Sequence, residues 1–115
     1  MITVVETPSF LKDVKRSRLS ESEHLELIAF LAANPKAGVL MEGTGGVRKI
    51  RFSVEGLGKR GAYRAVYYFH SDEIRLFALA LFAKNEKENL TQAERNELGA
   101  LMPEIVKAYQ ARKKS

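Results

Sequence analysis

The run "IRLFALALFA" (residues 74–83) limits the possible folds more than any other segment of the chain, because it is apolar on both faces of a strand. A strand of this kind has to be covered on both sides, and such strands usually lie in the interior of a sheet. We therefore predict an interior strand with helices packed on one face and further structure on the other.

Two further strands are predicted before this run. Residues 47–54 alternate with a period of two, which places Arg48, Ile50, Phe52 and Val54 on one face and Val47, Lys49, Arg51 and Ser53 on the other. The segment "YRAVYYF" (63–69) is aromatic and β-branched, so it predicts the next strand. Arg64 begins that strand and can join Lys49 and Arg51 if the pairing register allows. "ITVVE" (2–6) predicts a first strand at the amino end.

Two helices are predicted between the first strand and residue 47. "TPSFLKDVKRS" (7–17) has apolar residues at helical spacing behind a proline that suits a first helical turn. Ser20 and Glu23 then form the capping-box pattern that opens a second helix, which should end before Asn34. We predict that this second helix buries a stripe formed by Leu25, Ile28, Ala29 and Ala32 and widened by Leu27 and Leu31.

A last helix is predicted after the apolar run. Thr91 and Glu94 repeat the capping-box pattern, and the helix that follows should be kinked or divided by Pro103. The predicted order is β-α-α-β-β-β-α, an α+β fold with two N-terminal helices packed on a small, mainly antiparallel sheet and a C-terminal helix. Residues 1–115 should form a single domain, with a basic tail (111–115) that frays.

The segment "GLGKRGAYRAVYYF" (56–69) contains Gly56, Gly58 and Gly61 at the spacing of a dinucleotide-binding fingerprint. That fingerprint needs a helix after the glycines, because the amino end of the helix holds the pyrophosphate. A strand is predicted to follow here instead. We interpret the glycines as the connection of a β-hairpin, which excludes a nucleotide cofactor at this position.

Charge and composition restrict the chemistry further. The net charge is +5, and residues 47–64 hold six of the 19 basic residues against a single carboxylate, Glu55. These cations form either an ordinary solvated sheet face or a phosphate site. The chain has no cysteine, which excludes a thiolate nucleophile and a cysteine-based metal site. No apolar run could span a bilayer and the amino end does not resemble a signal peptide, so a cytoplasmic location is predicted.

Three segments, "VRKIRF" (47–52), "GKRGAYRAVYYF" (58–69) and "LFAKNEKENLTQAE" (81–94), together with the predicted element order, resemble the RelE/HigB-type toxins of bacterial type II toxin–antitoxin systems, especially the HigB-like branch. The resemblance covers nearly the whole chain. It implies a RelE-like fold and a ribosome-dependent mRNA endoribonuclease that inhibits translation. It also implies a cognate antitoxin with a helix-turn-helix DNA-binding domain as the partner, and a reaction that needs neither a metal nor a cofactor.

The resemblance also implies roles for individual residues. In such toxins a base removes the proton of a ribose 2′-hydroxyl, the oxygen attacks the adjacent phosphorus, and cations stabilise the charge on the phosphate. The catalytic residues implied here are Lys49, Arg51, Arg64 and Lys84, with Lys49 or Lys84 as the base and the arginines as phosphate ligands. The RNA-binding residues implied are Arg48, Lys59, Arg60 and Tyr63, the last by stacking on a base.

The chain departs from the RelE-like pattern after the last predicted strand. Asn85 follows Lys84, and Thr91 lies near a tyrosine position, where RelE-like members have an arginine and a tyrosine. The identity of the base is therefore left open. Two other functions are compatible with the sequence: a ParE-like toxin that inhibits gyrase without nuclease activity, and an inactive module that binds RNA or the ribosome.

Overall fold

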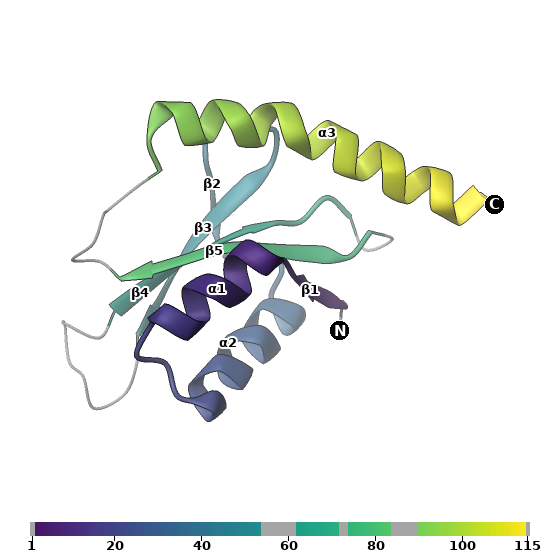
Figure 1. The fold of residues 1–115 in the computed structure, drawn as a ribbon. Coiled ribbons are helices and arrows are strands. Elements are labelled where there is room, and N and C mark those ends of the chain that lie inside the picture. The colour runs from purple at the N-terminus through teal and green to yellow at the C-terminus, as the bar shows by residue number, and fades with distance from the viewer. Residues whose placement is uncertain (1, 54–61, 72–73, 84–89, 115) are drawn as a thin grey trace.

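A five-stranded sheet lies between a pair of helices on one face and a single helix on the other (Figure 1). The computed structural model describes residues 2–53, 62–71, 74–83 and 90–114. Its strands are β1 (Val4–Glu6), β2 (Val39–Leu40), β3 (Val47–Ser53), β4 (Ala62–Tyr68) and β5 (Leu76–Ala83). Its helices are α1 (Pro8–Arg16), α2 (Glu21–Ala33) and α3 (Gln92–Lys114). The predicted α+β class is confirmed.

The strands lie in the order β1-β5-β4-β3-β2, with β1 parallel to β5 and the other neighbouring pairs antiparallel. The apolar strand β5 is thus flanked by β1 and β4, and helices lie on both faces of the sheet (Figure 1). This arrangement confirms the interior position predicted for residues 74–83. The two-residue strand β2 was not predicted, because a segment so short has no recognisable period of its own.

Helix α1 is attached to β5 just beyond the end of the short strand β1. The backbone N–H and the hydroxyl of Thr7 both donate to the carbonyl oxygen of Ala78, at 3.2 and 2.8 Å. Six residues further on, a carboxylate oxygen of Asp13 accepts the N–H of Leu81 at 2.9 Å. These bonds satisfy backbone groups of β5 at and beyond Ala78, the last residue that β5 pairs with β1.

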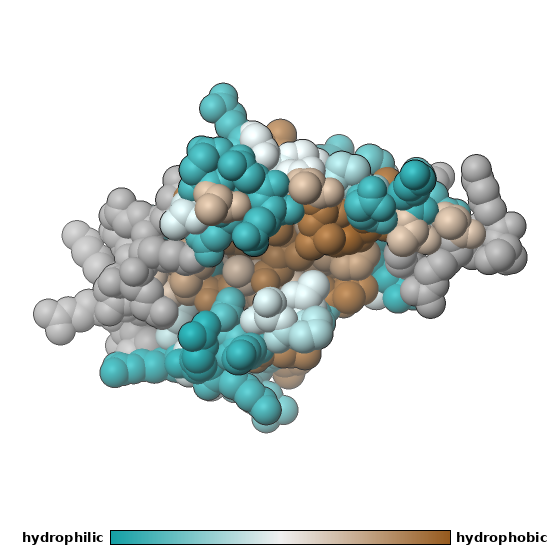
Figure 2. Space-filling view, turned by 45° about the horizontal axis from the view of Figure 1, so that its top comes forward, coloured by the Kyte–Doolittle hydropathy of each residue, from teal (hydrophilic) through white to brown (hydrophobic). Residues whose placement is uncertain are grey.

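The core is divided by the sheet into two clusters. Beneath α1 and α2 the buried residues include Phe10, Leu27, Leu31, Ala65 and Tyr67. Beneath α3 they include Met41, Val47, Val66, Phe82 and Met102. On the side seen in Figure 2, hydrophobic residues form a band through the middle of the molecule with hydrophilic residues above and below, as expected for a sheet between helical layers.

The stripe predicted for α2 is confirmed in part, since Ile28 packs against the core but Ala29 is exposed. Leu27 and Leu31 are fully buried, whereas Leu25 is 62% exposed. The half-buried His24 completes the sheet-facing side of the helix, where its Nε2 lies 3.0 Å from an Oε1 atom of Glu6 on β1. A polar residue can occupy this position because a carboxylate of β1 is its partner. The pattern of apolar residues in the helix cannot predict that partner.

Helix α3 begins as predicted. The N–H of Thr91 donates to the Glu94 carboxylate at 2.8 Å, and the N–H of Glu94 donates to the Thr91 hydroxyl at 3.1 Å. The helix is not divided at Pro103, whose exposed ring lies away from the sheet, and it continues to Lys114 through part of the tail that we expected to fray. In the segments that the structure describes, no helix combines the length and the apolar character needed to cross a membrane.

Candidate functional site

Three of the predicted catalytic residues lie on one face of the β3–β4 hairpin. Arg51 of β3 is the direct cross-strand partner of Arg64 of β4, and Lys49 precedes Arg51 by two residues on the same side of β3. This side is also the side of Val47 and Val66, which are buried under α3. The predicted convergence of Lys49, Arg51 and Arg64 is therefore present, on the sheet face that α3 covers in part.

Arg64 has an unusual environment within this cluster. It is half-buried, its other cross-strand neighbour is Phe82 of β5, and its Nε atom is buried without a hydrogen-bond partner among the described residues. A buried donor without a partner is costly, and the guanidinium opposite, that of Arg51, repels it. An anion with several acceptor oxygens would satisfy both groups, and a phosphate fits the planar fork of arginine.

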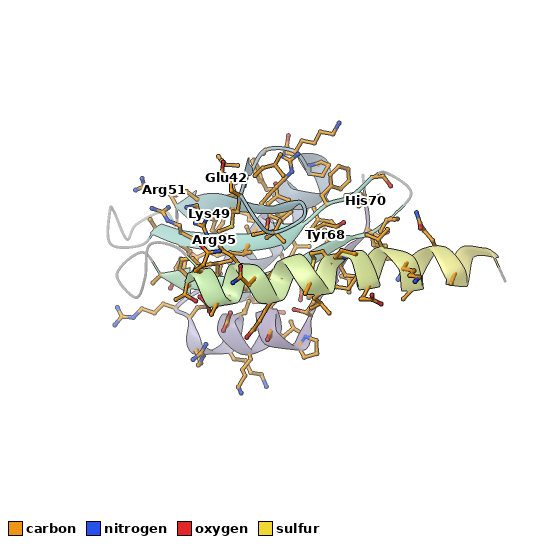
Figure 3. The ribbon with its side chains drawn as sticks, turned by 90° about the horizontal axis from the view of Figure 1, so that it is seen from above. Glu42, Lys49, Arg51, Tyr68, His70 and Arg95 are labelled. Carbon is orange, nitrogen blue, oxygen red and sulfur yellow. The ribbon has the colours of Figure 1, made fainter. Side chains whose placement is uncertain are left out.

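Helix α3 brings a further cation to this face. In Figure 3, which looks down on α3, Arg95 in the first part of the helix is labelled close to Lys49 and Arg51. Glu42, on the turn before β3, is labelled at the edge of the same group and is exposed. Arg95 was not predicted from the sequence as a site residue. The signal that could have found it is its spacing, three residues before Leu98 on the stripe that packs on the sheet.

Two of the predicted RNA-binding residues lie on the opposite face, where their contacts are with the protein itself and do not favour the predicted role. Arg48 is covered by the chain between α2 and β2, where its Nη1 donates to the carbonyl oxygens of Lys36 and Gly38 at 3.1 and 2.8 Å. Tyr63 is only 5% exposed, and its hydroxyl accepts the N–H of Arg18 at 2.9 Å. A base cannot stack on a ring that is packed under helices. Both residues neighbour catalytic candidates in sequence, but alternation along a strand turns them away.

Three other predicted residues lie outside the described residues. They are Lys84, Lys59 and Arg60, so their assignment as a catalytic residue and as two RNA-binding residues stays a prediction.

On the face of the sheet opposite the Lys49 side chain, Tyr67 holds the chain that precedes β2. The Tyr67 hydroxyl donates to the carbonyl oxygen of Pro35 at 2.9 Å and accepts the N–H of Gly38 at 2.8 Å. Burial raises the pKa of Tyr67 above its ordinary value, while the Gly38 N–H and the charge of Arg48 act in the opposite direction. A Cβ atom on Gly38 would lie 2.7 Å from the Tyr67 hydroxyl and 3.0 Å from the Lys49 carbonyl oxygen. The backbone at Lys49 is thus closely packed.

The two histidines have structural contacts. His24 is paired with Glu6, and a ring nitrogen of His70, Nδ1, lies 3.2 Å from the Tyr68 hydroxyl. Figure 3 shows Tyr68 and His70 further along α3 than Lys49 and Arg51. Neither histidine belongs to the cationic cluster. Within the described ranges no group of three or more histidine, aspartate or glutamate side chains is arranged to hold a metal ion.

Comparisons with known proteins agree with this architecture. The family model for the RelE toxin of the RelE/RelB toxin–antitoxin system matches residues 3–114. Among solved structures, the chain is similar to the E. coli toxin RelE, determined as a double arginine-to-alanine mutant in the free state. The TM-score is 0.53 at 16% sequence identity, over 76% of this chain and 87% of that one. The structural likeness shows a shared fold, and the family match covers nearly the whole sequence.

Proposed function

The chain belongs to the family of RelE toxins of RelE/RelB toxin–antitoxin systems, and on this premise we propose that it is a ribosome-dependent endoribonuclease that cuts messenger RNA. The observation that carries the proposal is the cross-strand pair of Arg51 and Arg64, in which the buried Nε of Arg64 has no partner among the described residues. Lys49 lies on the same face. In the free protein this arrangement is unfavourable, whereas the phosphate of an RNA backbone would provide acceptors for these cations.

The proposed reaction is an attack within the RNA strand. The ribose 2′-oxygen forms a bond to the adjacent phosphorus as its proton passes to a base, and the bond from phosphorus to the 5′-oxygen breaks as that oxygen gains a proton. The products are a 2′,3′-cyclic phosphate and a 5′-hydroxyl. Arg51 and Arg64 hold the non-bridging oxygens, whose negative charge grows as the attacking oxygen approaches.

Lys49 is the described residue that we assign as the base, because it lies on the face of the two arginines and because an amine, once deprotonated, can accept the proton of the 2′-hydroxyl. Lys84 is the alternative. Arginine is a poor base because its guanidinium stays protonated. The described part of the cationic face lacks a histidine. We therefore expect the protein to cut free RNA poorly and to depend on the ribosome to align the 2′-hydroxyl with the phosphorus.

The decisive experiment maps new messenger 5′ ends on ribosomes after induction of the toxin. Wild type should produce them, Arg64→Ala should not, and Lys12→Ala should behave like wild type because Lys12 is an exposed cation on α1, across the sheet. If expression damaged DNA while translation continued, the ParE-like alternative would hold. Ribosome binding without new 5′ ends would identify an inactive binding module.

The family implies an antitoxin as the partner. We propose that the cognate antitoxin carries a helix-turn-helix DNA-binding domain and covers the cationic face, where acidic side chains could neutralise Lys49 and Arg51. Co-expression with the adjacent reading frame should restore growth and yield a complex. Loss of that complex in a double variant of Lys49 and Arg51, with Lys12→Ala unaffected, would support the proposed contact. A complex that forms equally well with the double variant would contradict it.

A further inference from the structure

Helix α3 is seated on a glycine-rich turn between β2 and β3. Gly43, Gly45 and Gly46 have positive φ angles of 75°, 73° and 118°. The buried Thr44 closes the turn, since its hydroxyl donates to the Met41 carbonyl oxygen at 2.6 Å and accepts the Val47 N–H at 3.1 Å. A Cβ atom on Gly99 of α3 would lie 2.7 Å from the Gly43 carbonyl oxygen. The helix backbone therefore meets the turn at a distance that only glycine allows.

This contact between Gly99 and the turn determines which side chains of α3 can reach the cationic cluster. Arg95 is four residues before Gly99, so it lies on the same side of the helix and about 6 Å towards its amino end. Strand β3 leaves the turn at Val47 and reaches Lys49 after about 7 Å. In Figure 3 the first part of α3, Lys49 and Arg51 lie at the same end of the molecule. Arg95 and Lys49 are therefore at about the same distance from the turn, in the same direction.

The packing of α3 turns Arg95 towards the sheet. Leu98 and Met102, three and seven residues later, pack into the cluster under the helix, and Arg95 continues their stripe as a half-buried residue. A cation in the first turn of a helix is unfavourable, because the amino end carries partial positive charge. Three other cations on the neighbouring strands add to that cost. An anion shared with them would offset that cost.

We propose that Arg95 forms a second phosphate subsite with Lys49, so that α3 and the β3–β4 hairpin hold a single RNA strand between them, with one phosphate at Arg51 and Arg64 and a neighbouring phosphate at Arg95. This inference rests on the proposed function, because the ligand is the same RNA. It adds a residue of α3 to a site that the sequence pattern confines to the strands and the segment after β5.

A binding experiment tests the subsite without requiring cleavage. The probe is a short single-stranded RNA with 2′-O-methyl groups, which cannot be cut, and its affinity for the full chain is measured by fluorescence anisotropy at several salt concentrations. Arg95→Ala should weaken binding about 10-fold, as expected for one charge-assisted contact. It should also reduce the slope of log affinity against log salt by about 0.7. Arg95→Lys should keep the slope and lose part of the affinity.

The control is Lys107→Ala, which removes one exposed cation from the same helix. An equal loss of affinity in Lys107→Ala would overturn the subsite, because total charge alone would then explain binding. A structural role for Arg95 would arise from an ion pair with Glu42. Thermal midpoints lowered alike in Arg95→Ala and Glu42→Gln, with RNA affinity unchanged in Arg95→Ala, would also overturn the proposal.

The subsite and the proposed function fail in different ways. If Arg64→Ala abolishes cleavage on the ribosome but Arg95→Ala changes neither RNA affinity nor cleavage, the function holds and the subsite is refuted. If cleavage is unaffected by Arg64→Ala, the proposed function fails. The salt dependence of RNA binding by Arg95→Ala then still decides whether α3 contributes a phosphate contact.

Discussion

Arg51 of β3 and Arg64 of β4 lie directly opposite each other in the antiparallel ladder, on the face of the sheet that carries α3. Like charges in directly opposed cross-strand positions reduce the stability of a sheet. The Nε atom of Arg64 is in addition buried without a hydrogen-bond partner among the described residues. The pair therefore lowers the stability of the free protein, and a bound phosphate would offset that cost.

Replacing Arg51 with alanine should separate stability from activity. Arg51 is exposed, so Arg51→Ala should raise the free energy of unfolding by about 0.5 kcal/mol at low salt, because it removes the repulsion of Arg64. The gain should shrink at high salt. Urea unfolding measures the stability, and growth after induction measures the loss of toxicity. Lys12→Ala should change neither quantity, and a destabilised Arg51→Ala would contradict this account.

Tyr67 should make stability depend on alkaline pH. Its pKa is raised by burial, so the unfolded chain ionises at about pH 10 while the folded protein keeps the proton to higher pH. The contribution of Tyr67 is complete below about pH 10 and is lost as pH rises through the folded pKa. Tyr67→Phe should be less stable at neutral pH by about 1–3 kcal/mol, because the Pro35 carbonyl and the Gly38 N–H lose their partner.

The pH series provides its own control. Because phenylalanine cannot ionise, the free energy of unfolding of Tyr67→Phe should fall less steeply above about pH 10 than that of wild type. Lysine titration is common to both proteins and cancels in the difference. Urea unfolding at a series of pH values measures this difference in the free energy of unfolding. If the free energy fell equally steeply with pH in both proteins, the role given to Tyr67 would be refuted.

Gly99→Ala should destabilise the protein even though alanine is the better helix former. In an exposed helix this change stabilises by about 1 kcal/mol. Here the new Cβ would lie 2.7 Å from the Gly43 carbonyl oxygen, so α3 or the turn has to move, at a cost of about 1–3 kcal/mol. Ala100→Gly, at the next and exposed position, should lose about 1 kcal/mol by propensity alone. Thermal unfolding compares them, and a stabilised Gly99→Ala would show that α3 is not seated on the turn.

The two capping boxes offer a matched comparison. Ser20→Ala and Thr91→Ala should each cost about 1 kcal/mol, because each removes the acceptor of a helix N–H. Thr91→Ala should also lower RNA affinity, since it loosens the first turn of α3 that carries Arg95. Ser20→Ala should leave RNA affinity unchanged, because α2 lies on the other face of the sheet. Chemical unfolding and the anisotropy assay measure both effects, and equal effects on RNA affinity would contradict the assignment of Arg95.

Local chemistry explains which features were predictable. The capping boxes at Ser20 and Thr91 act within one helical turn, and the alternation of residues 47–53 follows from strand geometry, so both could be predicted. That same alternation turned Arg48 away from Lys49, and Tyr63 away from Arg64. The RNA-binding role expected for Arg48 and Tyr63 came from the family resemblance, and their position on the face away from Lys49 and Arg64 does not favour it.

The amino-acid pattern was enough to predict the type and order of the main elements, the period of each, and the cations that share one face of β3. The pairing of Arg64 with Arg51, the contact of His24 with Glu6, and the close approach of Gly99 to Gly43 could not be predicted from the sequence and are seen only in the folded chain. The difference lies in the distance along the chain between the residues that interact. Caps and periodicity depend on residues a few positions apart, whereas register and helix packing depend on contacts between residues that are distant along the chain.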